Sequence, residues 1–317
     1  METLAEWYSQ QSAYIFSTVA PTTARAYRVA WVHRLAPTLG DLPLDQIDAF
    51  VIETAVSQMS GARSTVNDAL ALLSRLMQRA HRGKRIEGNP VPDVELPRMV
   101  TPNPRTRALT PGEFQHLLAL IPEGNYRRFV AALGFTGMRF GEAAGLLVAD
   151  VDIPTRTITV CRQVTVGAHG ETRHAVPKSK HSRVVPIPRP FLPSVMDAVE
   201  GKDSGALVFP GTRGGYLRYK TLARALDWAN LREQVKVFPP GEPGLRFHDL
   251  RHTTAGLLFD AGVSAPDVQA VLGHSSLQVT QRYARARADV ATRAADSLTA
   301  LFDEVKPAGE VVTGNAV

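Results

Sequence analysis

A proline-rich segment is the feature that most constrains how this 317-residue chain can fold. The prolines of residues 89–105 are Pro90, Pro92, Pro97, Pro102 and Pro104. Proline lacks an amide hydrogen and fixes φ, so neither a continuous helix nor a central strand can pass through this segment. It predicts an extended, semi-rigid connector between two folded units. We therefore expect a domain at 1–95, a linker at 96–108, a second domain at 109–305 and a loose tail at 306–317.

The part before the prolines has the apolar periodicity of helices. The helices expected there are 3–16, 22–35, 44–59 and a fourth that begins after Ser64. The Thr22–Thr23 pair is suited to capping the second of them, and Pro37 with the Leu39–Gly40 step is expected to end it. Four helices joined by short loops predict a small helical domain.

The part after the prolines mixes two periodicities. Thr110 and Glu113 have the spacing of a capping box, with proline at the first helical position between them. The helices expected to follow are 111–120, 126–136 and 140–146. Runs rich in β-branched residues then predict short strands at 157–160, 164–166 and 183–187. Helical periodicity returns at Phe191 and continues to Val305, so the chain is predicted to be mainly α, with a mixed α+β second domain holding a small antiparallel sheet.

The charge of the chain is basic. Lys and Arg number 36 against 30 Asp and Glu, for a formal net charge of +6. Residues 1–100 are neutral overall, yet the segment 62–85 holds six cations against the single acid Asp68. Charge alone leaves two interpretations of this segment open, a solvated helix face and a surface that binds nucleic acid.

Several classes of protein lack support in the sequence. A single cysteine, Cys161, forms neither an internal disulfide nor a CxxC zinc site. The segment 211–215 is rich in glycine but lacks the Gly-Lys-Ser/Thr ending of a phosphate-binding loop. No HExxH motif is present, and we expect no metal and no cofactor. The N-terminus lacks the pattern of a secretion signal and no apolar run could span a bilayer, so a cytoplasmic protein with no membrane partner is expected.

Two polar motifs lie in the first half of the second domain, and each has an ordinary structural alternative. Arg139 stands at a glycine-flanked helix start, three residues before Glu142, which is also the spacing of a simple surface ion pair. Lys178 and Lys180 lie between two strand-like runs, where they could reach a phosphate or merely line a solvated turn.

Two more motifs follow near the end of the chain. His248 and Arg251 share a helix face if the helix has begun by His248, although a capped helix start with incidental basic residues fits as well. Gly273 is the expected left-handed stop of a helix, and His274 comes directly after it. Tyr283 lies nine residues further on, where a half-buried core tyrosine is the alternative.

In combination, the order Arg…Lys…His-x-x-Arg…His…Tyr resembles the tyrosine recombinase family, the phage integrases. The stretches that carry the resemblance are TTARAYRVAWVHRLAPTLG, GNP, TGMRFGEAAGL, HDLRHTTAGLLFDAG and LGHSS. They cover roughly residues 3–305. The resemblance implies an N-terminal four-helix, SAM-like core-binding domain and a mixed α+β catalytic domain that act together on double-stranded DNA recombination sites.

The resemblance also implies which residues hold the phosphate. Arg139 and Arg251 would clamp the scissile phosphate, and His274 would hold a non-bridging oxygen. Glu142 falls at the acidic position that supports the first arginine. These residue types suit the task, because arginine stays protonated and its forked donors match two phosphate oxygens.

The remaining roles concern the bond that forms and the bond that breaks. Tyr283 would be the nucleophile, and His248 would help to move its proton. Lys178 would protonate the leaving 5′ oxygen, and its choice over Lys180 rests on the register relative to Arg183. Since tyrosine has an ordinary pKa of about 10, it needs such basic neighbours in order to attack.

The implied activity is site-specific recombination through a 3′-phosphotyrosine intermediate, which integrates or excises phage or mobile-element DNA. The implied assembly is a homotetramer on two duplexes, with an accessory directionality factor or a host DNA-bending protein as further partners. An Xer-like resolvase of chromosome or plasmid dimers is the alternative within the family. A type IB topoisomerase and a non-catalytic DNA-binding regulator are the alternatives outside it.

Two further expectations concern the ends of the chain. The amphipathic segment 284–305 would pack on its own domain or, as the resemblance suggests, on a neighbouring subunit. The core-binding pattern begins almost at residue 3, so we expect no separate domain for distant arm sites before it.

Overall fold

The computed structural model describes residues 2–59, 63–96, 107–166, 172–175, 182–239, 242 and 244–273. The expected tail, the lysines between the strand-like runs, His274, Tyr283 and the segment 284–305 lie outside these residues. Among the described residues, no helix has the length and apolar character needed to cross a membrane.

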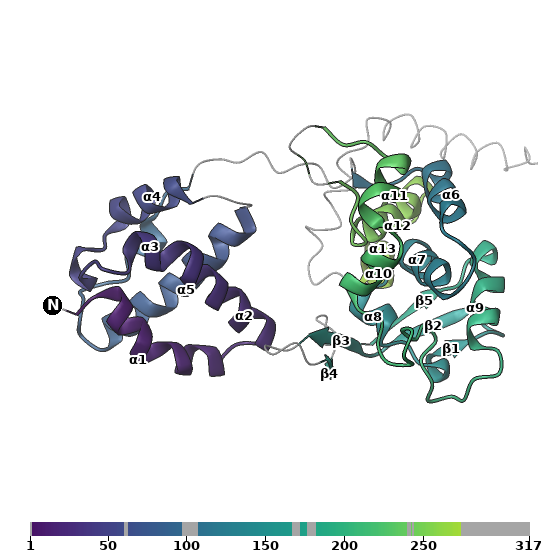
Figure 1. Cartoon of the computed structure of the whole chain (residues 1–317), viewed down its shortest axis with the longest axis horizontal. Helices are drawn as coiled ribbons and strands as arrows, with labels where there is room; N and C mark the ends of the chain where they lie inside the picture. Colours follow the sequence, from purple (N-terminus) through teal and green to yellow (C-terminus); the bar gives the residue numbers. More distant parts are fainter. Residues whose placement is uncertain are drawn as a thin grey trace, which may run out of the picture.

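The N-terminal unit is built from helices around one apolar core (Figure 1). Its α-helices are α1 (Leu4–Ser17), α2 (Pro21–Ala30), α3 (Ala36–Leu39), α4 (Ala49–Gln58) and α5 (Arg63–Arg82). The shorter helices are η1 (Trp31–Leu35, a π-helix), η2 (Leu44–Gln46) and η3 (Val91–Asp93). A capping box on Thr3 and Glu6 starts α1, and Trp7 donates from its indole Nε1 to the carbonyl of Leu76 at 2.9 Å. That bond ties α1 to α5, whose apolar stripe supplies much of this core.

Two of the four expected helices differ in detail. The threonine pair does not cap α2, because the helix already begins at Pro21, whose missing amide hydrogen costs nothing at a first helical position. Pro37 does not end the helix either, because α2, η1 and α3 follow one another without a break from Pro21 to Leu39. The prediction of one helix over 44–59 is wrong, because Ile47 is extended and Asp48 starts α4 afresh by accepting from the amide of Val51 at 2.8 Å.

The second unit has a larger core made of helices and strands (Figure 1). Its helices are α6 (Pro111–Leu120), α7 (Asn125–Thr136), α8 (Phe140–Ala144), η5 (Val148–Asp150), η6 (Arg189–Phe191), α9 (Leu192–Val199), α10 (Tyr219–Ala225), α11 (Trp228–Val235), α12 (Asp249–Asp260) and α13 (Ala265–Leu272). Its strands are β1 (Val151–Asp152), β2 (Thr157–Val160), β3 (Gln163–Val166), β4 (Thr172–Ala175) and β5 (Arg183–Pro186). The fold is therefore mainly α with a small antiparallel sheet, as predicted.

The strands form two antiparallel groups. One is the sheet β1-β2-β5, in which Ile158 of β2 pairs with Val185 of β5 and both side chains enter the core. The other is the hairpin β3-β4, which stands out from the body of the unit in Figure 1. β1 and β4 were not predicted. β1 is only two residues long and therefore carries no alternation that a sequence pattern could reveal.

Helix α7 lies at the centre of the second unit and contacts α6, α8, α9 and α12. Its Phe129, Val130, Ala132 and Leu133 are almost completely buried. The helix ends at Gly137, which has left-handed backbone angles with φ of 65°. A Cβ atom added at Gly137 would lie only 2.4 Å from the Leu272 side chain of α13. This close approach brings the ends of α7 and α13 together with the start of α12.

Candidate functional site

Arg139 is oriented by its own stretch of chain. It occupies the position before α8 with extended backbone angles, and Glu142 lies one helical turn further on. The Glu142 carboxylate accepts from the backbone amide of Arg139 at 2.8 Å and from its Nη1 at 2.9 Å. The Glu142 side chain is completely buried, whereas that of Arg139 is 23% exposed. Arg139 is thus anchored at its base and reaches toward solvent.

Arg251 enters the same place from α12, where it is the third residue of the helix. Its Nη1 donates to the carbonyl of Gly137 at 2.7 Å, and its Nη2 donates to the carbonyl of Leu272 at 2.5 Å. Arg251 is buried, so these carbonyls fix its plane against the ends of α7 and α13.

The end of α13 is the point at which the site comes together. Its last carbonyls have no partner within the helix and carry partial negative charge. Three consecutive carbonyls each accept from a different arginine: Val271 from Arg183 at 2.8 Å, Leu272 from Arg251 at 2.5 Å and Gly273 from Arg139 at 3.1 Å. Two of these arginines are the pair predicted to hold a phosphate, and the carbonyls that they bind immediately precede His274.

His248 lies directly before α12 with helical backbone angles, and it keeps an exposed surface. Desolvation by the surrounding protein and then the Arg251 charge lower the pKa of His248, with a smaller contribution from Arg139. The ring is therefore largely neutral near pH 7 and can accept a proton. His248 has helical backbone angles here, which is the condition under which the sequence predicts a shared helix face with Arg251.

Asp249 supports the start of α12 from behind. Its carboxylate is completely buried and accepts from Arg107 Nη2 at 2.7 Å, from the Arg246 amide at 2.8 Å and from Arg246 Nη2 at 3.0 Å. Burial raises the pKa of Asp249, but the hydrogen bonds from Arg107 and Arg246 outweigh burial and hold the pKa below its ordinary value. Arg107 is among the first described residues after the proline-rich segment, so this ion pair joins the entry of the second unit to the helix that carries Arg251.

The structure thus brings together Arg139, His248 and Arg251 among the predicted residues. Lys178, His274 and Tyr283 lie outside the described residues, and their roles stay predictions. The chain on either side of Lys178 is nevertheless described, up to Ala175 before it and from Ser182 after it. Arg183 starts β5 five residues after Lys178, and its contact with Val271 places the base of that segment beside the end of α13.

Sequence reasoning missed three residues of this site. In the sequence analysis Arg183 was used only as the reference position for choosing Lys178 over Lys180. Asp249 and Arg107 were given no role. A polar residue inside a motif such as HDLRH resembles any helix start, and only the burial of its carboxylate marks it as part of the support. For Arg183 the one available indication was its position at the end of a lysine-containing turn, directly before an apolar strand.

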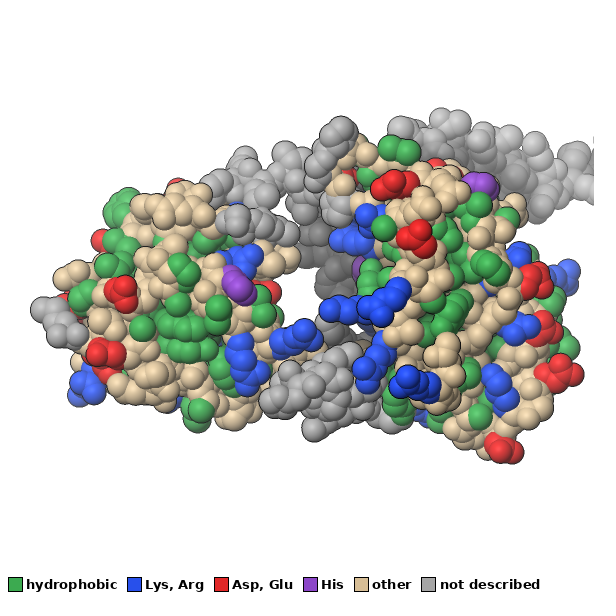
Figure 2. All heavy atoms as spheres, viewed as in Figure 1, with side chains coloured by type: hydrophobic (Ala, Val, Ile, Leu, Met, Phe, Trp, Pro, Cys, Tyr) green, Lys and Arg blue, Asp and Glu red, His purple; other side chains and the backbone are tan. Residues whose placement is uncertain are grey.

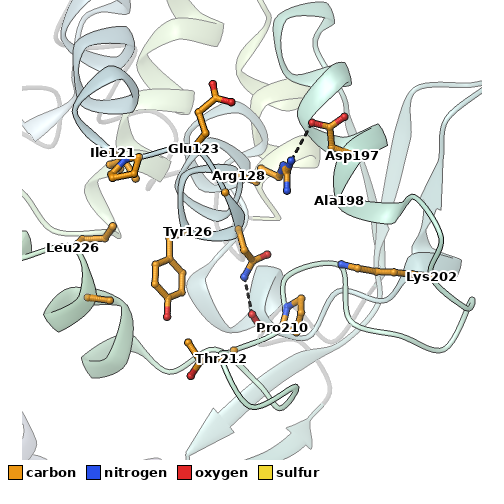
Figure 3. A pocket seen from close by; sticks show the side chains of 15 residues that line it. Ile121, Glu123, Tyr126, Arg128, Asp197, Ala198, Lys202, Pro210, Thr212 and Leu226 are labelled. Atoms are coloured by element: carbon orange, nitrogen blue, oxygen red, sulfur yellow. Dashed lines mark hydrogen bonds and ion pairs between the residues drawn. The ribbon is translucent and has the colours of Figure 1, made fainter.

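A separate cavity of about 510 Å³ lies at the other end of α7 (Figure 3). Arg128 and Asp197 form an ion pair of 3.0 Å on its wall, and Asn125 donates to the carbonyl of Pro210 at 2.6 Å. None of the predicted site residues that the structure describes lines it. The twelve residues of α7 separate this cavity from Gly137 by about 18 Å, since a helix rises 1.5 Å per residue. The arginine cluster is therefore distinct from this cavity.

Sequence comparison relates the chain to known proteins. Residues 107–289 match the model of the phage integrase family. The tyrosine recombinase XerC of Corynebacterium efficiens is 30% identical over 82% of this chain and 80% of its own length. A XerC-like tyrosine recombinase of Caldanaerobacter subterraneus is 32% identical, but the match spans only 49% of that protein. The integrase of Mycobacterium phage D29 is 26% identical over 80% of this chain and 67% of its own length.

Comparison with solved structures supports the same architecture. The integrase of transposon Tn1549, in complex with a circular intermediate DNA, matches with a TM-score of 0.74 at 21% identity, covering 96% of this chain and 100% of that one. A lambda integrase dimer bound to a core site matches with a TM-score of 0.64 at 18% identity, covering 89% and 95% of the two chains. At these identities the likeness concerns the fold.

Proposed function

Because the chain belongs to the phage integrase family of tyrosine recombinases, which cut and rejoin DNA strands, we propose that Tyr283 is the nucleophile and that Arg139 and Arg251 hold the phosphate it attacks. The observation that carries this proposal is the meeting of the two arginines at the carbonyl end of α13. In the sequence, His274 follows this helix end directly and Tyr283 comes nine residues after His274.

The chemistry follows from the charge of a phosphodiester. The transition state of phosphoryl transfer spreads negative charge over the equatorial oxygens, and preorganised donors stabilise that charge. Arg251 is held by backbone carbonyls of two helix ends, and Arg139 by Glu142 and a third carbonyl. Because these contacts fix both guanidinium planes before DNA binds, little reorganisation is needed at the moment of reaction.

One strand is cut in a single balanced step. The phenolic oxygen of Tyr283 forms a bond to phosphorus as the bond from phosphorus to the 5′ oxygen breaks. The phenolic proton passes to His248, whose lowered pKa leaves it able to accept, and Lys178 supplies a proton to the 5′ oxygen. Attack by a 5′ hydroxyl from another strand reverses the step and releases the tyrosine. The ester bond to tyrosine conserves the energy of the phosphodiester, so no nucleotide cofactor takes part.

The proposed substrate is a pair of double-stranded core sites, brought together by a homotetramer. A lambda integrase tetramer has been solved on a Holliday junction, and its fold matches this chain with a TM-score of 0.65 at 19% identity. Lys and Arg side chains gather over part of each unit of this chain, which suits binding to phosphates (Figure 2). An accessory directionality factor or a host DNA-bending protein stays a prediction.

We propose integration or excision of phage or mobile-element DNA as the outcome of the reaction. Resolution of chromosome or plasmid dimers is the second candidate, favoured by the 30% identity to the XerC protein over most of both chains. The two outcomes use the same strand chemistry and differ in the origin of the recombination sites.

The proposal is tested with a pool of nicked duplexes that carry a randomised core sequence. The nick lets the short strand beyond the cut diffuse away, so the full-length protein should stay joined to the 3′ phosphate of sites that it recognises. Recovery of covalent adducts under denaturing conditions and sequencing of their DNA then identifies the core site. We expect Tyr283→Phe to bind the selected site and form no adduct.

Tyr219→Phe is the matched control. Tyr219 is 46% exposed and packs against Phe140 and Phe247, and its loss should leave adduct formation intact. An adduct that persists in Tyr283→Phe would show that another residue is the nucleophile. Robust relaxation of supercoiled plasmid that lacks the selected site would instead favour a topoisomerase.

A further inference from the structure

A third arginine, Arg183, is built into the candidate site behind Arg139. Its Nη1 and Nη2 donate to the two oxygens of Glu142 at 3.0 and 2.7 Å, and its Nε donates to the carbonyl of Val271 at 2.8 Å. Only 7% of its side chain is exposed, so it makes these contacts away from solvent. Arg183 therefore touches both the carboxylate that holds Arg139 and the helix end that precedes His274.

The charges of this cluster explain why two arginines share one carboxylate. If Glu142 paired with Arg139 alone, its negative charge would offset much of the positive charge that Arg139 offers to a phosphate. Arg183 adds a second positive charge on the buried side, so the cluster keeps one net positive charge facing solvent. Burial raises the pKa of Glu142, but the hydrogen bonds and charge of Arg183, with those of Arg139, outweigh burial and keep the carboxylate ionised.

The geometry assigns Arg183 a mechanical part as well. A bidentate pair between arginine and carboxylate fixes the carboxylate plane, and this carboxylate in turn holds the amide and Nη1 of Arg139. Arg183 also packs closely on Gly273. A Cβ atom added at Gly273 would lie only 2.9 Å from the Cδ of Arg183. The left-handed Gly273, with φ of 65°, thus leaves room for the guanidinium to reach Val271.

We propose that Arg183 is a positioning residue for strand cleavage, which balances the charge of Glu142 and holds Glu142 and the end of α13 in place, so that Arg139 is free to bind the phosphate. This inference rests on the proposed role of Arg139 in holding the scissile phosphate. Arg183 touches no DNA in this mechanism and acts through Glu142 and Val271.

The test compares Arg183→Met, Glu142→Gln and the double variant, all in the full chain. The measurement is the single-turnover rate of adduct formation on the selected nicked site, at protein concentrations that saturate the DNA. We expect Arg183→Met to bind the site normally and to lose about 10²-fold in rate, the scale found when one preorganised donor is lost. Adding Glu142→Gln should restore about tenfold, because it removes the buried negative charge that Arg183 had balanced.

A pH profile separates this role from general damage to the fold. In Arg183→Met the largest cause that lowers the pKa of Glu142 is gone, so that pKa rises. As pH falls, Glu142 becomes protonated and resembles glutamine. The rate of Arg183→Met should therefore approach that of the double variant at low pH and fall away from it at high pH.

A second measurement identifies the route by which Arg183 acts. A sulfur in place of the leaving 5′ oxygen departs without a proton, since a thiol ionises near pH 8.5. This substrate should rescue Lys178→Ala but leave the deficit of Arg183→Met unchanged. Rescue of Arg183→Met would mean that Arg183 acts through the lysine segment, and the proposal would be wrong.

Two other results would also overturn it: a normal rate for Arg183→Met, or a double variant no faster than Arg183→Met. If Arg183→Met does not fold by circular dichroism, Arg183→Gln takes its place in every comparison, because glutamine is uncharged but keeps an N–H donor about where the arginine Nε lies. Tyr283→Phe is run in parallel. An adduct in that variant would refute the proposed nucleophile while leaving the Arg183 comparison to be judged on its own rates.

Discussion

At the scale of single residues, the second unit depends on two carboxylates that are completely buried and each bound by two arginines. Glu142 binds Arg139 and Arg183, and Asp249 binds Arg107 and Arg246. A buried carboxylate without such partners would be costly, and removal of one partner leaves an uncompensated charge. The carboxylates are closed off from water, so their charge is compensated by these arginines, which are held in place as a result.

Two histidines make stability depend on pH: His248, directly before α12, and His252, within it. Burial lowers the pKa of His252 to about 4, against an ordinary value of about 6.5. The unfolded chain therefore binds a proton in this interval that the folded chain does not bind. The resulting contribution to stability is complete above about pH 6.5 and is lost as pH falls toward about 4.

We expect His252→Gln to reduce this loss. The measurement is the urea midpoint of unfolding at pH 7 and at pH 5, followed by tryptophan fluorescence. Trp7 and Trp31 of the N-terminal unit contribute equally in both chains, and the buried Trp228 reports on the second unit. Both chains keep His248, whose lowered pKa acts in the same direction, so the native chain should lose more stability than the variant. Equal losses in the two chains would contradict the assignment to His252.

At the scale of elements, the end of α7 is where three helices meet. Gly137 adopts left-handed angles, and its carbonyl accepts from Arg251. We expect Gly137→Ala to destabilise the second unit by about 1–3 kcal/mol, because alanine resists these angles and its Cβ would meet Leu272 at 2.4 Å. Strand cleavage should fall as well, since Arg251 would lose its fixed partner. Urea denaturation and the adduct assay measure the two effects.

Gly112→Ala is the control for this substitution. Gly112 lies in the first turn of α6, and no heavy atom lies within 4 Å of an added Cβ. Alanine there should leave stability unchanged or raise it by up to about 1 kcal/mol. A destabilisation by Gly137→Ala no larger than that by Gly112→Ala would mean that the approach of α13 does not depend on this glycine.

At the scale of the whole molecule, the open question is whether the basic helix α5 faces DNA or only solvent. Arg75 and Arg82 are exposed and lie seven residues apart on one side of the helix. Arg79, between them, instead donates to Gln11 and stacks over Tyr14 of α1. The exposed Arg75 and Arg82 are therefore the candidates for contact with DNA, whereas Arg79 stabilises the N-terminal unit.

We expect Arg75→Ala and Arg82→Ala each to weaken binding to the selected core site and to reduce the salt dependence of binding by about one phosphate contact. The measurement is the slope of log affinity against log salt concentration. Arg127→Ala is the control, because this arginine of α7 in the second unit pairs with Glu123, which lies just before the helix. An unchanged slope in both α5 variants would favour the solvated-face interpretation.

Much of the fold could be predicted because it depends on local patterns. The capping box of Thr110 and Glu113 and the strand at 157–160 occur as expected, and Gly273 is the left-handed stop that was predicted. The errors lie where local rules compete. The run 44–59 has continuous helical periodicity, yet the aspartate at 48 offers a better helix start and divides it.

The sequence by itself determined the family, the mainly α fold with its small sheet, and the order in which the expected site residues occur. Only the tertiary structure decided which groups hold Arg139 and Arg251 in place, and it revealed Arg183 as a member of the site. The reason is physical. The last carbonyls of every helix need partners, and here those partners come from arginines 21, 88 and 134 residues away along the chain. Which distant donor reaches which carbonyl depends on how the helices pack, and no local pattern in the sequence records it.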